Sequence, residues 1–72
     1  MKKILVTYHM RKTNTEEVET CIELALDTFI ADQLINRFTE GMGYGTLETI
    51  IDNLAYLQGG LTGGKIVDIR EA

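Results

Sequence analysis

Three basic residues lie in two short segments that could together bind an anion. Arg11 and Lys12 fall in the segment 9–15, and Lys65 ends the glycine-rich segment 59–65. Backbone amides at a helix start or in a glycine-rich turn bind phosphate or carboxylate, and basic side chains reinforce them. The residues expected to contact such a ligand are His9, Arg11, Lys12, Thr13, Asn14, Thr15, Gly63, Gly64 and Lys65. Solvated basic residues beside ordinary turns are the simpler alternative.

A second candidate surface is acidic and would bind a protein. If residues 14–40 are helical, four carboxylates share one helix face, opposite the apolar face. These are Glu16, Glu19, Glu23 and Asp27. They could dock on a basic partner protein, although a row of charges on a helix is more often simply a solvated face.

The residues that usually carry catalysis are sparse. His9 has no Asp, Cys or Ser at a spacing typical of a catalytic group, and Cys21 lies among apolar residues that predict a place in the core. His9 and Cys21 are also too few for a structural zinc, which normally takes four ligands. We therefore expect no enzyme, metal or cofactor. An active site assembled across subunits around His9 is a weaker third possibility.

Two familiar phosphate-binding motifs are matched only in part. The run 12–15, Lys-Thr-Asn-Thr, resembles the phosphate loop of flavodoxin-like proteins at Asn14 and Thr15 alone, and the chain is too short for their five-stranded sheet. A Walker loop needs Ser or Thr after its lysine and then a helix, whereas Ile66 follows Lys65 and begins a strand-like run. Neither motif implies a nucleotide or flavin site.

The elements that would position these residues begin with a strand over 3–10. Ile4, Val6, Tyr8 and Met10 alternate with Leu5 and polar residues, which predicts one core-facing row. A helix is then expected over 14–40, because Thr13 and Glu16 fit a capping box and Gly41 can end a helix.

The second half of this helix is apolar on nearly every side. The residues responsible are Phe29, Ile30, Leu34, Ile35 and Phe38. Nothing else in the chain is long enough to cover a helix over 14–40, which would span ~40 Å at 1.5 Å per residue. The helix therefore breaks near Ala31 and Asp32, or these residues form an oligomer interface, which is the alternative we favour.

A second helix over 47–58, capped by Thr46, and a final strand over 65–69 complete a β-α-α-β order. Two helices between two strands allow the strands to pair antiparallel, so that the loops 9–15 and 59–65 meet at one end. The fold class is therefore α/β of the α+β type, a single domain over 1–72 with a small two-stranded sheet. Such a sheet is marginal alone, so self-association would complete it.

Size and charge narrow the function further. A chain of 72 residues with one cysteine cannot add an internal disulfide to its small core, which again favours a homo-oligomer. The lone thiol and the lack of a secretory segment predict a cytoplasmic protein, and no apolar run suits a membrane. A net charge of −4 argues against direct binding to nucleic acid.

These features predict a non-catalytic, oligomeric binding protein that acts by occupancy. Its ligand would be a phosphorylated or other anionic small molecule at the two loops. The alternative is a mobile-element-type inhibitor or adaptor, whose acidic face would bind a basic protein.

Overall fold

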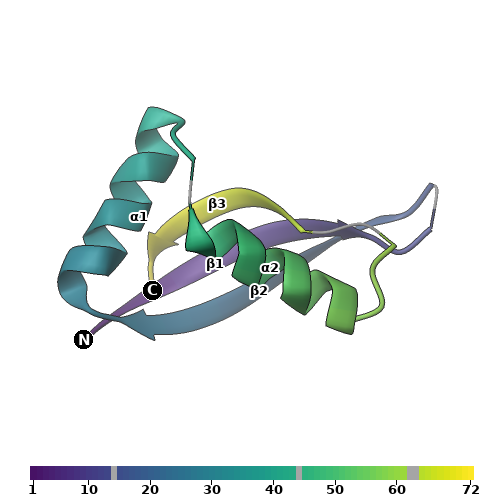
Figure 1. Cartoon of the computed structure of the whole chain (residues 1–72), viewed down its shortest axis with the longest axis horizontal. Coiled ribbons are helices and arrows are strands. Elements are labelled where there is room, and N and C mark those ends of the chain that lie inside the picture. The colour runs from purple at the N-terminus through teal and green to yellow at the C-terminus, as the bar shows by residue number, and fades with distance from the viewer. Residues whose placement is uncertain (14, 44, 62–63) are drawn as a thin grey trace.

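The computed structural model describes residues 1–13, 15–43, 45–61 and 64–72. Its elements in chain order are β1 (Lys2–Arg11), β2 (Glu17–Leu26), α1 (Thr28–Glu40), α2 (Thr46–Leu57) and β3 (Lys65–Glu71). The three strands form one antiparallel sheet in the order β2-β1-β3, and the two helices pack on one of its faces (Figure 1). The fold is therefore α+β as predicted, with three strands in the sheet instead of two.

Strand β1 lies at the centre and supplies four of the nine buried core residues in the described part of the chain. Its inward row, Ile4, Val6, Tyr8 and Met10, is buried as the alternation predicts. Helices α1 and α2 add Ala31, Leu47, Ile51 and Ala55 to this core, and β3 adds Ile69. The phenol of Tyr8 donates a 2.5 Å hydrogen bond to Gln58 Oε1 just beyond α2, so its polar end is satisfied.

The prediction of a helix over 14–40 is wrong for its first half. Residues 17–26 form β2, which pairs with β1 along its whole length, from Arg11 opposite Glu17 to Lys2 opposite Leu26. Exposure alternates residue by residue along this segment, with Val18, Ile22 and Leu24 packed towards the core and Glu17, Glu19, Cys21 and Glu23 exposed. Pairing with β1 satisfies this alternation, whereas an isolated helix would leave much of its apolar face uncovered.

Helix α1 begins at Thr28, directly after β2, and runs without a break through Ala31 and Asp32. The Asp27 carboxylate accepts a 2.9 Å hydrogen bond from the Phe29 amide and caps the helix. The helix ends at Glu40 as predicted, with Gly41 in the left-handed conformation at φ 72°. Lys2 ties the helix to β1 through a 2.6 Å ion pair with Asp32.

Helix α2 and strand β3 follow the predicted ranges closely, with two local differences. Thr46 is the first residue of α2, and Gly45 precedes it at φ 58° without a side-chain cap, so the predicted cap by Thr46 is wrong. In β3 the pairing with β1 slips between Thr7 and Tyr8. Because of this bulge, Ile66 and Ile69 both pack against the core although they are three residues apart, whereas a regular strand places on one face only residues an even number apart.

The helices cover the sheet unevenly. Their contacts fall mainly on β3 and β1, and the inward row of β2 is only partly buried. Neither of the two described helices covers the opposite face of the sheet, which carries Lys3, Leu5, Thr7 and His9 from β1. None of the helices within the described ranges is long and apolar enough to cross a membrane.

Candidate functional site

The predicted helix start at Thr13 is the turn of the β1–β2 hairpin. Thr13 Oγ1 accepts hydrogen bonds from the amides of Thr15 and Glu16, at 3.3 and 2.9 Å, and the Lys12 amide donates to the Glu16 carbonyl at 3.1 Å. The side-chain bond expected of a capping box is present, but it closes a turn instead of starting a helix. A helix dipole therefore does not contribute to anion binding at this loop.

The two loops that hold the basic residues do meet. His9 pairs with Lys65 across β1 and β3, and the Leu61 amide donates a 2.5 Å hydrogen bond to the Arg11 carbonyl. Arg11, Lys12 and Lys65 are all exposed. The antiparallel pairing that predicted this meeting is confirmed. Two residues of the predicted site, Asn14 and Gly63, lie outside the described residues.

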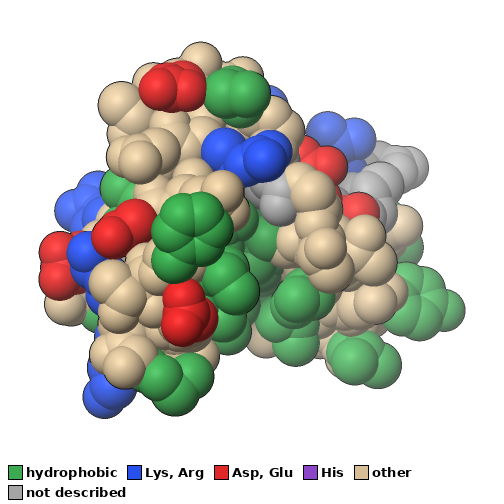
Figure 2. All heavy atoms as spheres, turned by 60° about the vertical axis from the view of Figure 1, so that its left-hand side comes forward, with side chains coloured by type: hydrophobic (Ala, Val, Ile, Leu, Met, Phe, Trp, Pro, Cys, Tyr) green, Lys and Arg blue, Asp and Glu red, His purple; other side chains and the backbone are tan. Residues whose placement is uncertain are grey.

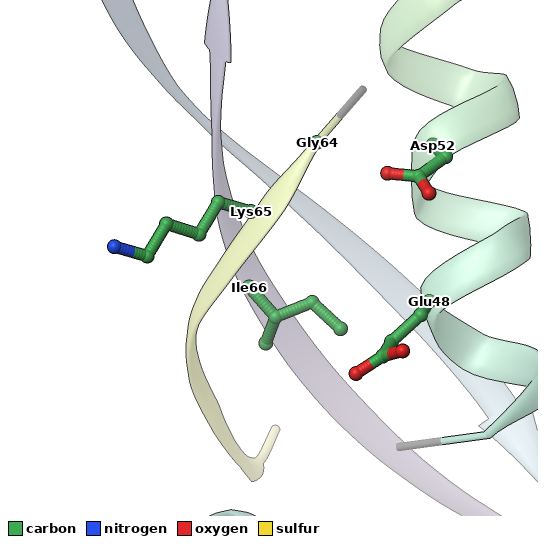
Figure 3. Close-up of a pocket in the computed structure, with 5 residues that line it drawn as sticks. All are labelled: Glu48, Asp52, Gly64, Lys65 and Ile66. Carbon is green, nitrogen blue, oxygen red and sulfur yellow. The ribbon is translucent and has the colours of Figure 1, made fainter. Parts of the chain in front are cut away.

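Lys65 and Gly64 also line a pocket of about 370 Å³ between α2 and β3. Its other lining residues are Glu48, Asp52 and Ile66. The two carboxylates extend from α2 towards β3, whereas the Lys65 side chain extends away from α2 (Figure 3). The charge inside this pocket is therefore negative, and an anion would have to bind outside it, on the side of Lys65.

Gly64 has a structural role that was not predicted. A Cβ atom at this position would lie 2.5 Å from Ile51 Cγ2 and 3.1 Å from the Tyr8 ring. Glycine is therefore needed because β3 approaches α2 and Tyr8 closely. The sequence predicts that Gly64 contacts a ligand, whereas the structure places it against the protein's own core.

His9 is held between two carboxylates on the open face of the sheet. Its Nε2 lies 3.1 Å from Glu19 Oε1 and its Nδ1 lies 3.3 Å from Glu17 Oε1. The hydrogen bond with Glu19 is the main reason that the pKa of His9 rises above 6.5, and Glu17 adds to it against partial desolvation. Protonated His9 therefore ties β1 to β2.

The acidic residues predicted to share a helix face are distributed differently. Glu19 and Glu23 lie on the open face of β2 together with Glu17, because side chains two apart share a face of a strand. Glu16 belongs to the hairpin turn and Asp27 caps α1. We call Glu17, Glu19 and Glu23 the acidic row. All three are more than half exposed, at 53, 66 and 53% of their side chains.

The acidic row lies beside basic residues of β1. Lys3 Nζ is 3.5 Å from Glu23 Oε1, and Arg11 pairs opposite Glu17. Cys21 lies within the row, exposed and 3.2 Å from Thr7 Oγ1, so the expectation that it is buried in the core is wrong. The carboxylates therefore form the outer margin of the open face, with their positive neighbours on the inner side.

A largely apolar groove of about 240 Å³ opens on the helical side of β2. It is lined by Leu24, Leu26, Ile30, Leu34, Thr46, Leu47 and Ile50. Hydrophobic side chains gather across the middle and lower part of the face shown in Figure 2. The groove exists because the helices cover β3 and β1 more than β2.

The predicted oligomer interface is divided by the structure. Leu34, Ile35 and Phe38 pack against the protein's own core, whereas Phe29 and Ile30 remain 69 and 49% exposed. Strands β1 and β3 cover the inner side of helix α1, so most of its apolar residues are not available to a second subunit. Only its first turn offers large exposed apolar side chains to a second subunit.

The outer edge of β2 is a feature that the sequence reasoning missed. Within the described part of the chain, β2 pairs only with β1, so the polar groups along its other edge have no strand partner over ten residues. The available signal was the placement of Val18, Ile22, Leu24 and Leu26 two or four residues apart, with Glu17, Glu19 and Glu23 at the alternate positions. An unpaired edge of this length can accept another strand.

The described residues contain no group of three or more potential metal ligands and no buried side-chain polar atom without a partner. The His9 ring contacts carboxylates and no nucleophile. No family model matches the sequence, and no curated protein or solved structure shows significant similarity to the chain.

Proposed function

We propose that this protein is a non-catalytic binding protein. It acts by binding to a basic partner protein and occupying part of that partner's surface. The observation that carries this proposal is the acidic row, three exposed carboxylates on the least covered strand of the sheet. These carboxylates have basic neighbours only on their inner side, so along the outer margin of the sheet they can attract a partner of the opposite charge. The role corresponds to an inhibitor or adaptor, with the acidic surface on a strand instead of a helix.

Charge reversal tests this proposal directly. The double variant Glu19→Lys/Glu23→Lys should lose its partner in a pull-down from host lysate, because two attractive contacts become repulsive. The matched control is Glu40→Lys/Asp52→Lys, which changes net charge equally at exposed helix positions. Because reversal also places new lysines beside Lys3 and His9, the neutral pair Glu19→Gln/Glu23→Gln serves as a milder variant. Equal recovery of every partner by all four proteins would exclude the acidic row.

A second candidate function is anion binding at the loops 9–15 and 59–65. It is favoured by the hydrogen bond from Leu61 to Arg11, which holds three exposed basic residues at one end of the sheet. Arg11 should contribute more than Lys12, because its planar guanidinium can bond two phosphate oxygens. Calorimetry with inorganic phosphate and nucleotides, comparing Arg11→Ala with Lys12→Ala, tests it. No heat of binding at millimolar ligand would rule it out.

Self-association belongs to the same proposal. Phe29 and Ile30 present apolar surface at the first turn of α1, and a small domain gains stability from covering such surface. A homo-oligomer formed there would leave the acidic row free on the opposite face of the sheet.

A further inference from the structure

Strand β2 combines three features along one line. Among the described residues no strand pairs with its outer edge over ten residues, or ~34 Å at 3.4 Å per residue. Its open-face side carries the acidic row. Its other side carries the partly buried residues Val18, Ile22 and Leu24, and leads into the apolar groove. A ligand that matches all three would have to be an extended polypeptide, because only a strand can pair with the edge and reach both faces.

We propose that β2 binds an extended segment of the basic partner, which adds to the sheet as a fourth strand. This inference rests on the proposed function and specifies how the partner is recognised. Side chains of an added strand alternate between the two faces, so one set would lie beside the acidic row and the other beside the apolar residues. The segment recognised is therefore one in which basic and apolar residues alternate.

Charge decides between such a segment and a second copy of β2. Two copies paired about Cys21 would place Glu19 opposite Glu23, and pairing about Glu23 would place that residue opposite itself. Pairing about Ile22 avoids direct opposition, since Glu19 then faces Ala25, but it still places two acidic rows on adjacent strands. Like charges across strands are destabilising and opposite charges stabilising, so a basic strand fits this edge better.

The apolar groove determines where along β2 the apolar side chains of the added strand would bind. It is lined by Leu24 and Leu26 from the C-terminal half of β2, together with Ile30 and Leu34 of α1. Apolar side chains of the added strand would enter the groove at this end. Basic side chains would be most useful opposite Glu19 and Glu23, which are four residues apart and therefore on the same face.

The experiment uses the whole protein and a synthetic peptide as the probe. The peptide alternates arginine and valine over eight residues, with polar ends for solubility, and its affinity is measured by fluorescence anisotropy. A second peptide has the same composition with the arginines and valines in separate blocks. Two further peptides carry N-methyl groups on alternate amides, one on each of the two sets, because only one set can face β2.

The alternating peptide should bind at least about tenfold more tightly than the block peptide, because only alternation matches both faces. One N-methylated peptide should lose binding and the other should retain it. Equal affinity of both N-methylated peptides and the parent would overturn strand addition. If all three peptides nevertheless bound more weakly to Glu19→Gln/Glu23→Gln than to wild type, the acidic row would still bind basic partners and the proposed function would survive.

Two other outcomes are decisive. Unchanged peptide affinity in Glu19→Gln/Glu23→Gln would show that the acidic row does not recognise basic segments. Both the proposed function and strand addition would then be wrong. If the protein sediments as a dimer that persists in Phe29→Asp, and the peptide neither dissociates nor binds this dimer, the edge is occupied by a second copy and strand addition is wrong.

Discussion

Gly64 is the residue whose replacement should most clearly affect stability. Gly64→Ala should lower the free energy of unfolding by about 1–3 kcal/mol, the usual cost of overpacking, because the new methyl group meets Ile51 and Tyr8. Urea denaturation followed by circular dichroism measures the change. Gly43→Ala is the matched control, since a Cβ there meets nothing within 4 Å. Equal stability of the two variants would show that β3 and α2 do not approach so closely.

His9 should make stability depend on pH. Its pKa in the folded protein is raised above the ordinary 6.5 by Glu19 and Glu17, so the folded state binds the proton more tightly than the unfolded state. The stabilisation is therefore complete below pH 6.5 and is lost as the pH rises through the folded-state pKa. Wild type should exceed His9→Gln in denaturation midpoint at pH 5.5, and the difference should shrink at pH 8.5. A difference independent of pH would exclude the charged contact. An NMR titration of the His9 ring gives the pKa itself.

At the scale of elements, the sequence predicts most of the architecture and misses one strand. The segments 3–10, 47–58 and 65–69 are close to the observed elements, and the antiparallel pairing of the first and last is confirmed. Residues 17–26 were misassigned because their apolar residues fit both the spacing of a helix and the alternation of a strand. Val18, Ile22 and Ala25 follow helical spacing, and glutamate, leucine and alanine all favour helices. The alternation of Val18, Ile22, Leu24 and Leu26 fits a strand equally well, and the unpaired edge of β1 decides the outcome.

The same misassignment explains what was missed in the candidate site. The meeting of the loops 9–15 and 59–65 follows from strand pairing and was predictable. The acidic row could not be placed correctly, because Glu16 and Asp27 belong with Glu19 and Glu23 only on a helix. The bulge between Thr7 and Tyr8 could not be predicted from the sequence, since Ile66 and Val67 are both apolar and either could face the core.

Asp27 separates β2 from α1, and its replacement tests that boundary. Asp27→Ala should destabilise the protein by about 1 kcal/mol, because the Phe29 amide loses its capping acceptor. Asp27→Asn keeps an acceptor oxygen and should retain most of the stability. Thermal denaturation of both variants measures the effect. If the alanine variant matched wild type, the capping bond would contribute nothing to stability.

At the scale of the whole molecule, the exposed first turn of α1 predicts self-association. Phe29→Asp should shift the protein towards monomer in analytical ultracentrifugation at micromolar concentration while its circular dichroism is unchanged, because a charge would be buried in the interface. Leu57→Asp is the control, since Leu57 is 80% exposed and lies on α2. Leu34 is a poorer choice, because it packs against the protein's own core. If wild type sedimented as a monomer, the prediction of self-association would be wrong.

The central position of β1 also determines the order in which the protein can fold. Its pairing with β2 starts from neighbours in the chain, with Arg11 opposite Glu17, whereas its pairing with β3 joins His9 to Lys65 across most of the sequence. Local contacts form with little loss of chain entropy, and a hairpin can form within about 1–10 μs. We therefore expect the hairpin to form early and β3 to dock last, together with the helices. Substitutions in β2 would then mainly slow folding, and substitutions in β3 would mainly speed unfolding.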